Sequence, residues 1–203
     1  MIVCESARLR LRHLLDSDAP FVLELLNEPD FIRNIGDREV RTLEDARRYI
    51  QHGPMLSYSQ HGFGLWLVAS REGGAPLGIC GLLKRDYLQD VDVGFALREA
   101  HRGKGYAFEA AAAAMRHGKE DLGISRIVAI TSPDNHPSAR VLRKLGLEFE
   151  RTIRIPDQSH ATHLFTPAVR SLLADSANPD VERPDEKREA ERSADAEAGR
   201  PDR

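Results

Sequence analysis

One strand–loop–helix unit in the middle of the chain constrains the fold more than any other feature. Residues 90–97 alternate between polar and apolar side chains, which is the period of a β-strand. From Tyr106 to about Asp121 the chain is rich in alanine, the best helix former, and Gly123 marks the end of that helix. The connection contains Gly103 and Gly105, which permit unusual backbone angles. A strand that passes into a long helix in this way predicts a domain in which helices pack on a sheet.

The other periodic segments extend this unit into a mixed fold. Alternating or continuous apolar runs predict strands, and apolar residues at helical spacing predict helices. The segments are a strand at residues 7–12, helices at 16–26 and 42–50, a hairpin formed by 64–69 and 76–83, a strand at 126–130, a helix at 138–145 and a strand at 147–155. The strand at 147–155, alone or with one more strand after it, completes the order, which matches neither a doubly wound nucleotide fold nor a barrel.

The composition changes sharply near Ala174. Beyond it the chain consists almost entirely of charged residues, Ala, Pro, Ser and Asn, with Val181 as the single large aliphatic side chain. Such a segment cannot bury enough apolar surface to offset the entropy lost on ordering. We expect one folded domain over residues 1–172 and a charged tail over 173–203 that is disordered, or alternatively a solvated helix.

Charge and cysteine content exclude several classes of protein. The formal net charge of −3 argues against a nucleic-acid binder. The two cysteines, Cys4 and Cys80, form no metal or disulfide pattern, and Cys80 lies in an apolar run that predicts burial. The start of the chain lacks the apolar run of a signal peptide, and no stretch approaches the ~20 apolar residues of a membrane span. We therefore expect a cytoplasmic protein.

The loop Arg102-Gly103-Lys104-Gly105-Tyr106-Ala107 is a candidate phosphate or pyrophosphate site. Its glycines allow a ligand to approach closely, and the N–H groups at the start of the helix favour an anion. The side chains of Arg102 and Lys104 add positive charge. An ordinary glycine-rich turn is the alternative, since the loop carries neither the Walker nor the Rossmann pattern of glycines.

This hexapeptide resembles the Gln/Arg-x-x-Gly-x-Gly/Ala signature of the GNAT superfamily of N-acetyltransferases. The likeness covers roughly Ser6 to Ile155. Residues 7–12, followed by Asp18-Ala19, look like the opening of the RimJ/RimL-like branch, which acetylates ribosomal-protein N-termini. Residues 134–147 (Asp-Asn-His-Pro-Ser-Ala-Arg-Val-Leu-Arg-Lys-Leu-Gly-Leu) look like the second motif of that branch.

The resemblance implies an α+β (mixed α/β) fold with a single GNAT-like domain. Its central, mostly antiparallel sheet would have six to seven strands flanked by helices, and one strand pair would splay apart to admit coenzyme A. Acetyl-CoA would be the acyl donor, with no metal. Its pantetheine arm would lie against the backbone of Phe95 and Leu97, and its pyrophosphate would bind the backbone amides of residues 102–107. The acceptor would be a primary amine, on a protein N-terminus or a small molecule, and the protein a monomer or homodimer.

Catalysis in such an enzyme needs a base, because an ammonium group is not a nucleophile. Asp92 is our candidate base, and a solvated carboxylate on an exposed strand face is the alternative. Asn135 and Ser138 match the family's second motif, in which they would order the pantetheine or assist the thiolate. Capping of the following helix explains the same two residues equally simply. Many relatives carry a proton-donating Tyr where this chain has Leu142, so a general acid is not identified.

Other features are weaker. Residues 33–38 would form a specificity loop between the first two helices, although the same charges would suit any solvated surface. His160 and His163 lack a third ligand for zinc, and His101 is expected to be an exposed loop residue. A non-catalytic coenzyme A-binding module, with a regulatory or partner-binding role, is the alternative to an enzyme. A different phosphate-ligand protein is the third hypothesis.

Overall fold

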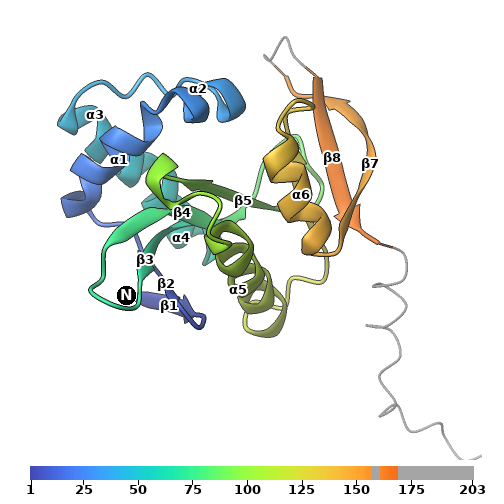
Figure 1. The fold of residues 1–203 in the computed structure, drawn as a ribbon, viewed down its shortest axis with the longest axis horizontal. Coiled ribbons are helices and arrows are strands. Elements are labelled where there is room, and N and C mark those ends of the chain that lie inside the picture. The colour runs from blue at the N-terminus through green and yellow to red at the C-terminus, as the bar shows by residue number, and fades with distance from the viewer. Residues whose placement is uncertain (157–160, 169–203) are drawn as a thin grey trace, which may run out of the picture. The chain divides into compact units, whose positions relative to one another are not determined.

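The computed structural model describes residues 1–156 and 161–168. The predicted boundary at residue 172 and the tail at 173–203 lie outside the described residues. The elements follow one another as β1 (Ile2–Glu5), β2 (Leu9–Arg12), η1 (Asp16–Asp18), α1 (Ala19–Leu26), α2 (Pro29–Ile35), α3 (Leu43–Ile50), η2 (Gln51–Met55), α4 (Leu56–His61), β3 (Leu65–Ser70), β4 (Pro76–Leu83), β5 (Val91–Leu97), η3 (Glu99–His101), α5 (Tyr106–Glu120), β6 (Ile127–Thr131), α6 (His136–Lys144), β7 (Leu147–Arg154) and β8 (Ala161–Pro167) (Figure 1).

The strands form one sheet in the order β1-β2-β3-β4-β5-β6-β8-β7. Every neighbouring pair is antiparallel except β5 and β6, which are parallel. The mixed fold is as predicted, but the described sheet has eight strands rather than six or seven. The additional strand, β1, has only four residues, and none of them is fully buried. A segment so short and exposed carries no alternation that could reveal it.

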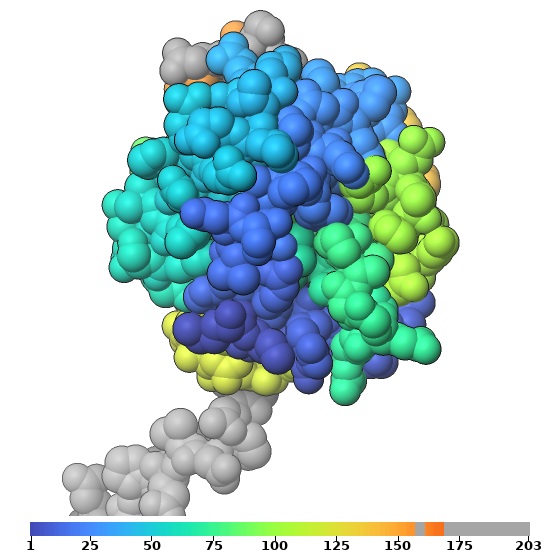
Figure 2. All heavy atoms as spheres, turned by 90° about the vertical axis from the view of Figure 1, so that its left-hand side faces the viewer, coloured from blue at the N-terminus to red at the C-terminus, as the bar shows by residue number. Residues whose placement is uncertain are grey.

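The sheet is buried on both faces near its centre, and β3 shows this directly. Trp66 and Val68 belong to a core that includes α5 and α6, whereas Leu67 and Ala69 belong to a second core with α1 and α3. Successive strand residues point to opposite faces. Figure 2 shows the second of these layers, where the blue and cyan residues of α1–α4 cover most of the visible face.

Two helical segments were not predicted from the sequence. α2 begins at Pro29, shortly after the end of the helix predicted at residues 16–26. Proline is tolerated at the first helical position, where its missing N–H has no partner to lose. The expected loop at residues 33–38 is therefore partly helical, because α2 continues to Ile35. The second segment, η2 and α4, contains Pro54 and ends at Gly62, whose φ is 77°.

β5 and β6 separate soon after they meet. Their pairing consists of Val91 with Ile127 and Asp92 with Val128, after which β6 pairs with β8 instead. On the other side β5 stays paired with β4 as far as Leu97. The far part of β5 therefore has one free edge, which opens into the space between the two halves of the sheet.

Candidate active site

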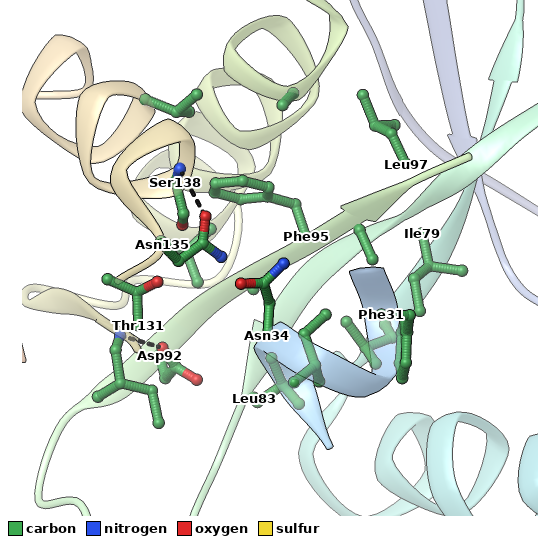
Figure 3. A pocket seen from close by; sticks show the side chains of 18 of the residues that line it. Phe31, Asn34, Ile79, Leu83, Asp92, Phe95, Leu97, Thr131, Asn135 and Ser138 are labelled. Atoms are coloured by element: carbon green, nitrogen blue, oxygen red, sulfur yellow. Dashed lines mark hydrogen bonds between the residues drawn. The ribbon is translucent and has the colours of Figure 1, made fainter. Parts of the chain in front are cut away.

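A cavity of about 1090 Å³ fills the space between the separated strands. It extends from the loop after β5, past Phe95 and the start of α6, to α2 and the β4–β5 connection. Figure 3 shows Phe95, Asn135 and Ser138 gathered together, with Thr131 and Asp92 nearer the point where the strands part. All the predicted site residues on β5, the loop and α6 except Lys104 thus line one cavity.

The loop before α5 presents a run of backbone donors. Within the described part of the chain, the N–H groups of residues 103–108 have no hydrogen-bond acceptor. Gly103 and Gly105 have φ values of 73° and 81°, a region that glycine enters without strain. The predicted set of amides at 102–107 needs one correction, because the Arg102 N–H donates to the Glu99 carbonyl at 3.1 Å. Free N–H groups at the start of a 15-residue helix favour an anion.

The side chains of Arg102 and Lys104 do not lie free beside these amides as expected. Arg102 forms ion pairs with Glu28, at 2.5 Å, and with Asp30. Lys104 donates from Nζ to the carbonyl oxygen of Ala100 at 2.8 Å. The charge of Arg102 is balanced by two carboxylates, so its side chain joins the loop to the segment that begins α2. The backbone amides are the principal anion donors of this loop.

The free edge of β5 offers backbone groups to the same cavity. The Arg98 N–H donates to the Leu77 carbonyl at 3.0 Å, so Arg98 directs its backbone groups toward β4. In an antiparallel pair, residues that face the partner strand alternate with residues that face away from it. By that alternation, the N–H and C=O groups of Phe95 and Leu97 point away from β4. The Leu97 carbonyl already accepts from Arg102 Nε at 2.9 Å. A strand-like ligand arm along this edge would therefore find both groups of Phe95 and the N–H of Leu97.

Asn135 and Ser138 form the cap of α6. The Asn135 side-chain oxygen accepts from the Ser138 N–H at 3.1 Å, as in an ordinary N-cap. The capping alternative is therefore correct for Asn135. Both residues also line the cavity, and the Ser138 hydroxyl has no partner among the described residues. Capping uses the side-chain oxygen of Asn135 and not its NH2 group, so it does not prevent a role toward a ligand.

Asp92 lies where β5 and β6 part, and its side chain is only 1% exposed. The alternative of a solvated carboxylate is therefore wrong. Arg85 Nε donates to its Oδ2 at 2.6 Å, and the Ile130 N–H donates to its Oδ1 at 3.3 Å. Burial raises the pKa of Asp92, and these two donors offset that effect only in part. The carboxylate thus lines the cavity as a stronger base than a solvated aspartate.

Sequence reasoning missed Arg85 after β4 and Thr131 at the end of β6, two polar residues that line the cavity where β5 and β6 part, whereas Asn34 on α2 belongs to the predicted specificity segment 33–38. Arg85 lies seven residues before Asp92, with a turn between them, and no local pattern pairs the two. At the position where relatives carry Tyr, Leu142 is 1% exposed and borders the cavity, so it supplies no proton there.

Comparison with known proteins decides the family. Residues 8–148 match the Acetyltransferase (GNAT) domain. The chain belongs to the GNAT acetyltransferase family. One relative, the uncharacterized N-acetyltransferase YnaD of Bacillus subtilis (strain 168), is 37% identical over 143 residues, which is 70% of this chain and 81% of YnaD.

Solved GNAT structures have the same fold. The acetyltransferase of Bacillus anthracis aligns with a TM-score of 0.67 and 25% identity, covering 82% of this chain and 97% of that protein. RimL, a ribosomal L7/L12 α-N-protein acetyltransferase solved in complex with coenzyme A, aligns with a TM-score of 0.70 and 20% identity. The alignment covers 82% of this chain and 97% of RimL. The predicted α+β class and acyltransferase assignment are thus confirmed, and the RimL neighbour agrees with the RimJ/RimL-like branch.

The described residues of this GNAT chain contain no group of three His, Cys, Asp or Glu side chains placed to hold a metal ion. His163 packs edge-on against Phe149, while His160 lies outside the described residues. No helix in the described ranges is long and apolar enough to cross a membrane. Cys80 is buried as predicted.

Proposed function

We propose that this protein transfers an acetyl group from acetyl-CoA to a primary amine by direct attack in a ternary complex. One observation carries the proposal. In the described part of the chain, the six consecutive N–H groups of residues 103–108 have no protein acceptor, and five of these six residues line the same cavity as the free edge of β5. A diphosphate fits the first feature, and an extended amide-bearing arm fits the second. Coenzyme A carries both groups in one molecule.

In this proposal the diphosphate binds the amides of residues 103–108, and the pantetheine arm lies along Phe95 and Leu97. Coenzyme A supplies the acetyl group as a thioester. Asn135 and Ser138 border the arm from α6, and the Ser138 hydroxyl is positioned to hydrogen-bond the departing sulfur. A β5 amide near Phe95 stabilises the charge that develops on the carbonyl oxygen.

The amine enters from the other end of the cavity, which Asn34, Tyr49 and Lys84 line. Its nitrogen must lose a proton before it attacks the carbonyl carbon, and Asp92 accepts that proton directly or through water. The carbon–sulfur bond then breaks, and the thiolate needs little help to leave because a thiol has a pKa near ~8.5. The acceptor is a protein N-terminus or a small amine.

Incubation with acetyl-CoA and a panel of small amines and peptides, followed by measurement of free thiol, tests the activity. We expect release of coenzyme A with at least one acceptor. Thermal stabilisation by coenzyme A without turnover on any acceptor would support the non-catalytic binding module instead. Absence of stabilisation and of turnover would refute the coenzyme A site itself.

Replacing Asp92 by Asn tests the base. Asn keeps an oxygen for the Ile130 N–H but cannot take a proton, so the variant should lose turnover at every pH. Asp90→Asn is the matched control, since Asp90 is paired with Arg126 at 3.0 Å outside the cavity lining. In the wild type, activity should fall as pH drops through the raised pKa of Asp92. An Asp92→Asn variant that retains both the rate and this pH limb would remove Asp92 as the base.

A further inference from the structure

The turn between β1 and β2 contains a side chain that reaches the loop after β5. Arg8 donates from Nη1 to the carbonyl oxygen of Lys104 at 3.1 Å. Its guanidinium group also lies over the ring of Tyr106, 4.6 Å from the ring centroid. Lys104 and Tyr106 both belong to the run of residues whose N–H groups have no acceptor within the described ranges. The catalytic steps above make no use of Arg8.

Glu109, in the first turn of α5, fixes Arg8 in this position. Its Oε1 accepts from the Arg8 backbone N–H and from the Ser6 hydroxyl, both at 2.8 Å. Its Oε2 accepts from Arg8 Nε at 2.7 Å and Nη2 at 2.6 Å. Burial by itself would raise the pKa of Glu109, but these donors lower it below its ordinary value. The ionised carboxylate balances the charge of Arg8, so Arg8 acts on the loop through its geometry rather than through a free charge.

The contact with Lys104 determines which way one backbone donor points. In a trans peptide the carbonyl of one residue and the N–H of the next point in opposite directions. Because the Lys104 carbonyl points to Arg8, the Gly105 N–H points away from Arg8. Gly105 borders both the large cavity and a smaller one, of about 390 Å³, to which Arg8 belongs. The side opposite Arg8 is therefore the side of the large cavity.

We propose that Arg8 is a positioning residue for the donor's diphosphate: it holds the Lys104 carbonyl outside the site and so directs the Gly105 N–H into it. The inference rests on the proposed coenzyme A site. This peptide turns about ψ of Lys104 and φ of Gly105, and Gly105, whose φ is 81°, permits the rotation because glycine is little restricted in φ. A rotated peptide would turn a carbonyl oxygen toward the diphosphate, where it would repel the ligand.

Calorimetric titration of coenzyme A into Arg8→Gln and Arg8→Lys tests the proposal. Arg8→Gln should lower the affinity roughly ten-fold, the equivalent of one hydrogen bond to a charged group. Arg8→Lys keeps the charge, but its single ammonium group cannot bind Glu109 and the Lys104 carbonyl as the guanidinium does, so it should lose affinity as well. Arg10→Gln is the matched control, because Arg10 has the same side chain and, among the residues that the structure describes, its ion pair is with Glu5, away from the loop.

The Gly105 amide signal in a ¹H–¹⁵N spectrum distinguishes the proposed positioning role of Arg8 from a purely structural role. In the wild type and in Arg10→Gln this signal should move on saturation with coenzyme A, and in Arg8→Gln it should move much less. The proposal would be overturned if Arg8→Gln bound coenzyme A within two-fold of the wild type, or if Arg10→Gln lost as much affinity. It would also be overturned if the Gly105 signal moved as far in Arg8→Gln as in the wild type. Failure of the proposed function would look different, because the wild-type protein itself would then show no binding.

Discussion

Replacing Arg85 by Met leaves the carboxylate of Asp92 buried without its partner. Asp92 is 1% exposed and Arg85 25%, so the two partners are unequal. A guanidinium group left alone can still contact water and the hydroxyl of Tyr87, 3.1 Å away, whereas the carboxylate, 1% exposed, would keep only the Ile130 N–H among the donors in the described residues. Breaking a buried pair costs about 3–5 kcal/mol. For a chain of this size, that corresponds to a fall in melting temperature of roughly 6–20 °C.

The loss should depend on pH, with a sign that follows from the pKa of Asp92. Burial raises this pKa above its ordinary value of 3.8, and removal of Arg85 raises it further. At pH values between the ordinary pKa of the unfolded state and the raised pKa of the folded state, the folded chain binds a proton that the unfolded chain has lost. The free energy of unfolding therefore falls as pH rises through that window. Relative to the wild type, Arg85→Met should therefore be strongly destabilised near neutral pH and only slightly affected near pH ~4, where the folded state holds the proton and about half of the unfolded molecules hold it too.

Thermal unfolding followed by circular dichroism at a series of pH values measures both effects. The double variant Arg85→Met with Asp92→Asn should regain most of the lost stability, because no charge is then left buried. Arg126→Met is the control: its partners Asp90 and Glu150 are 30% and 41% exposed, so the cost should stay below about 1 kcal/mol. Equal destabilisation at pH 4 and 7, or no recovery in the double variant, would refute the reasoning.

Three further outcomes are expected. Gly81→Ala should cost about 3 kcal/mol or more in urea unfolding, because a Cβ there would lie 2.0 Å from the Gly64 carbonyl oxygen, whereas Gly53→Ala, with nothing within 4 Å, should cost far less. Gly105→Ala should weaken coenzyme A binding by up to roughly 30-fold in calorimetry, since its φ of 81° costs a side-chain-bearing residue about 1–2 kcal/mol; unchanged affinity would contradict the loop geometry. Burial raises the pKa of Cys4 to about 11, so iodoacetamide at pH ~8 should alkylate it only after denaturation, as mass spectrometry would show.

Features that depend on neighbouring residues in the chain were predictable from the sequence. The strand–loop–helix unit around Gly103 and Gly105 is one example, because periodicity and backbone freedom are local properties. The cap formed by Asn135 is another, since the oxygen and the N–H that it binds are three residues apart. The cavity follows from these elements together with the family resemblance.

Features that depend on the sheet as a whole were not predictable. Asp92 occupies a polar position in an alternating strand, which by itself indicates exposure, yet this end of β5 is covered on both sides. Arg102 was expected to face the ligand, but its partners Glu28 and Asp30 lie more than 70 residues earlier in the chain. No local pattern encodes a contact over such a separation.

The ion pairs of Arg102 have a consequence for engineering. Glu28 and Asp30 stand at the start of α2, whose later residues border the amine end of the cavity, while Arg102 stands at the start of the diphosphate loop. A graft that exchanges α2 with that of a relative, in order to redirect acceptor choice, would also remove the anchor of the donor loop. Such chimeras should carry both carboxylates across, or their altered selectivity will be confounded by a weaker hold on the acyl donor.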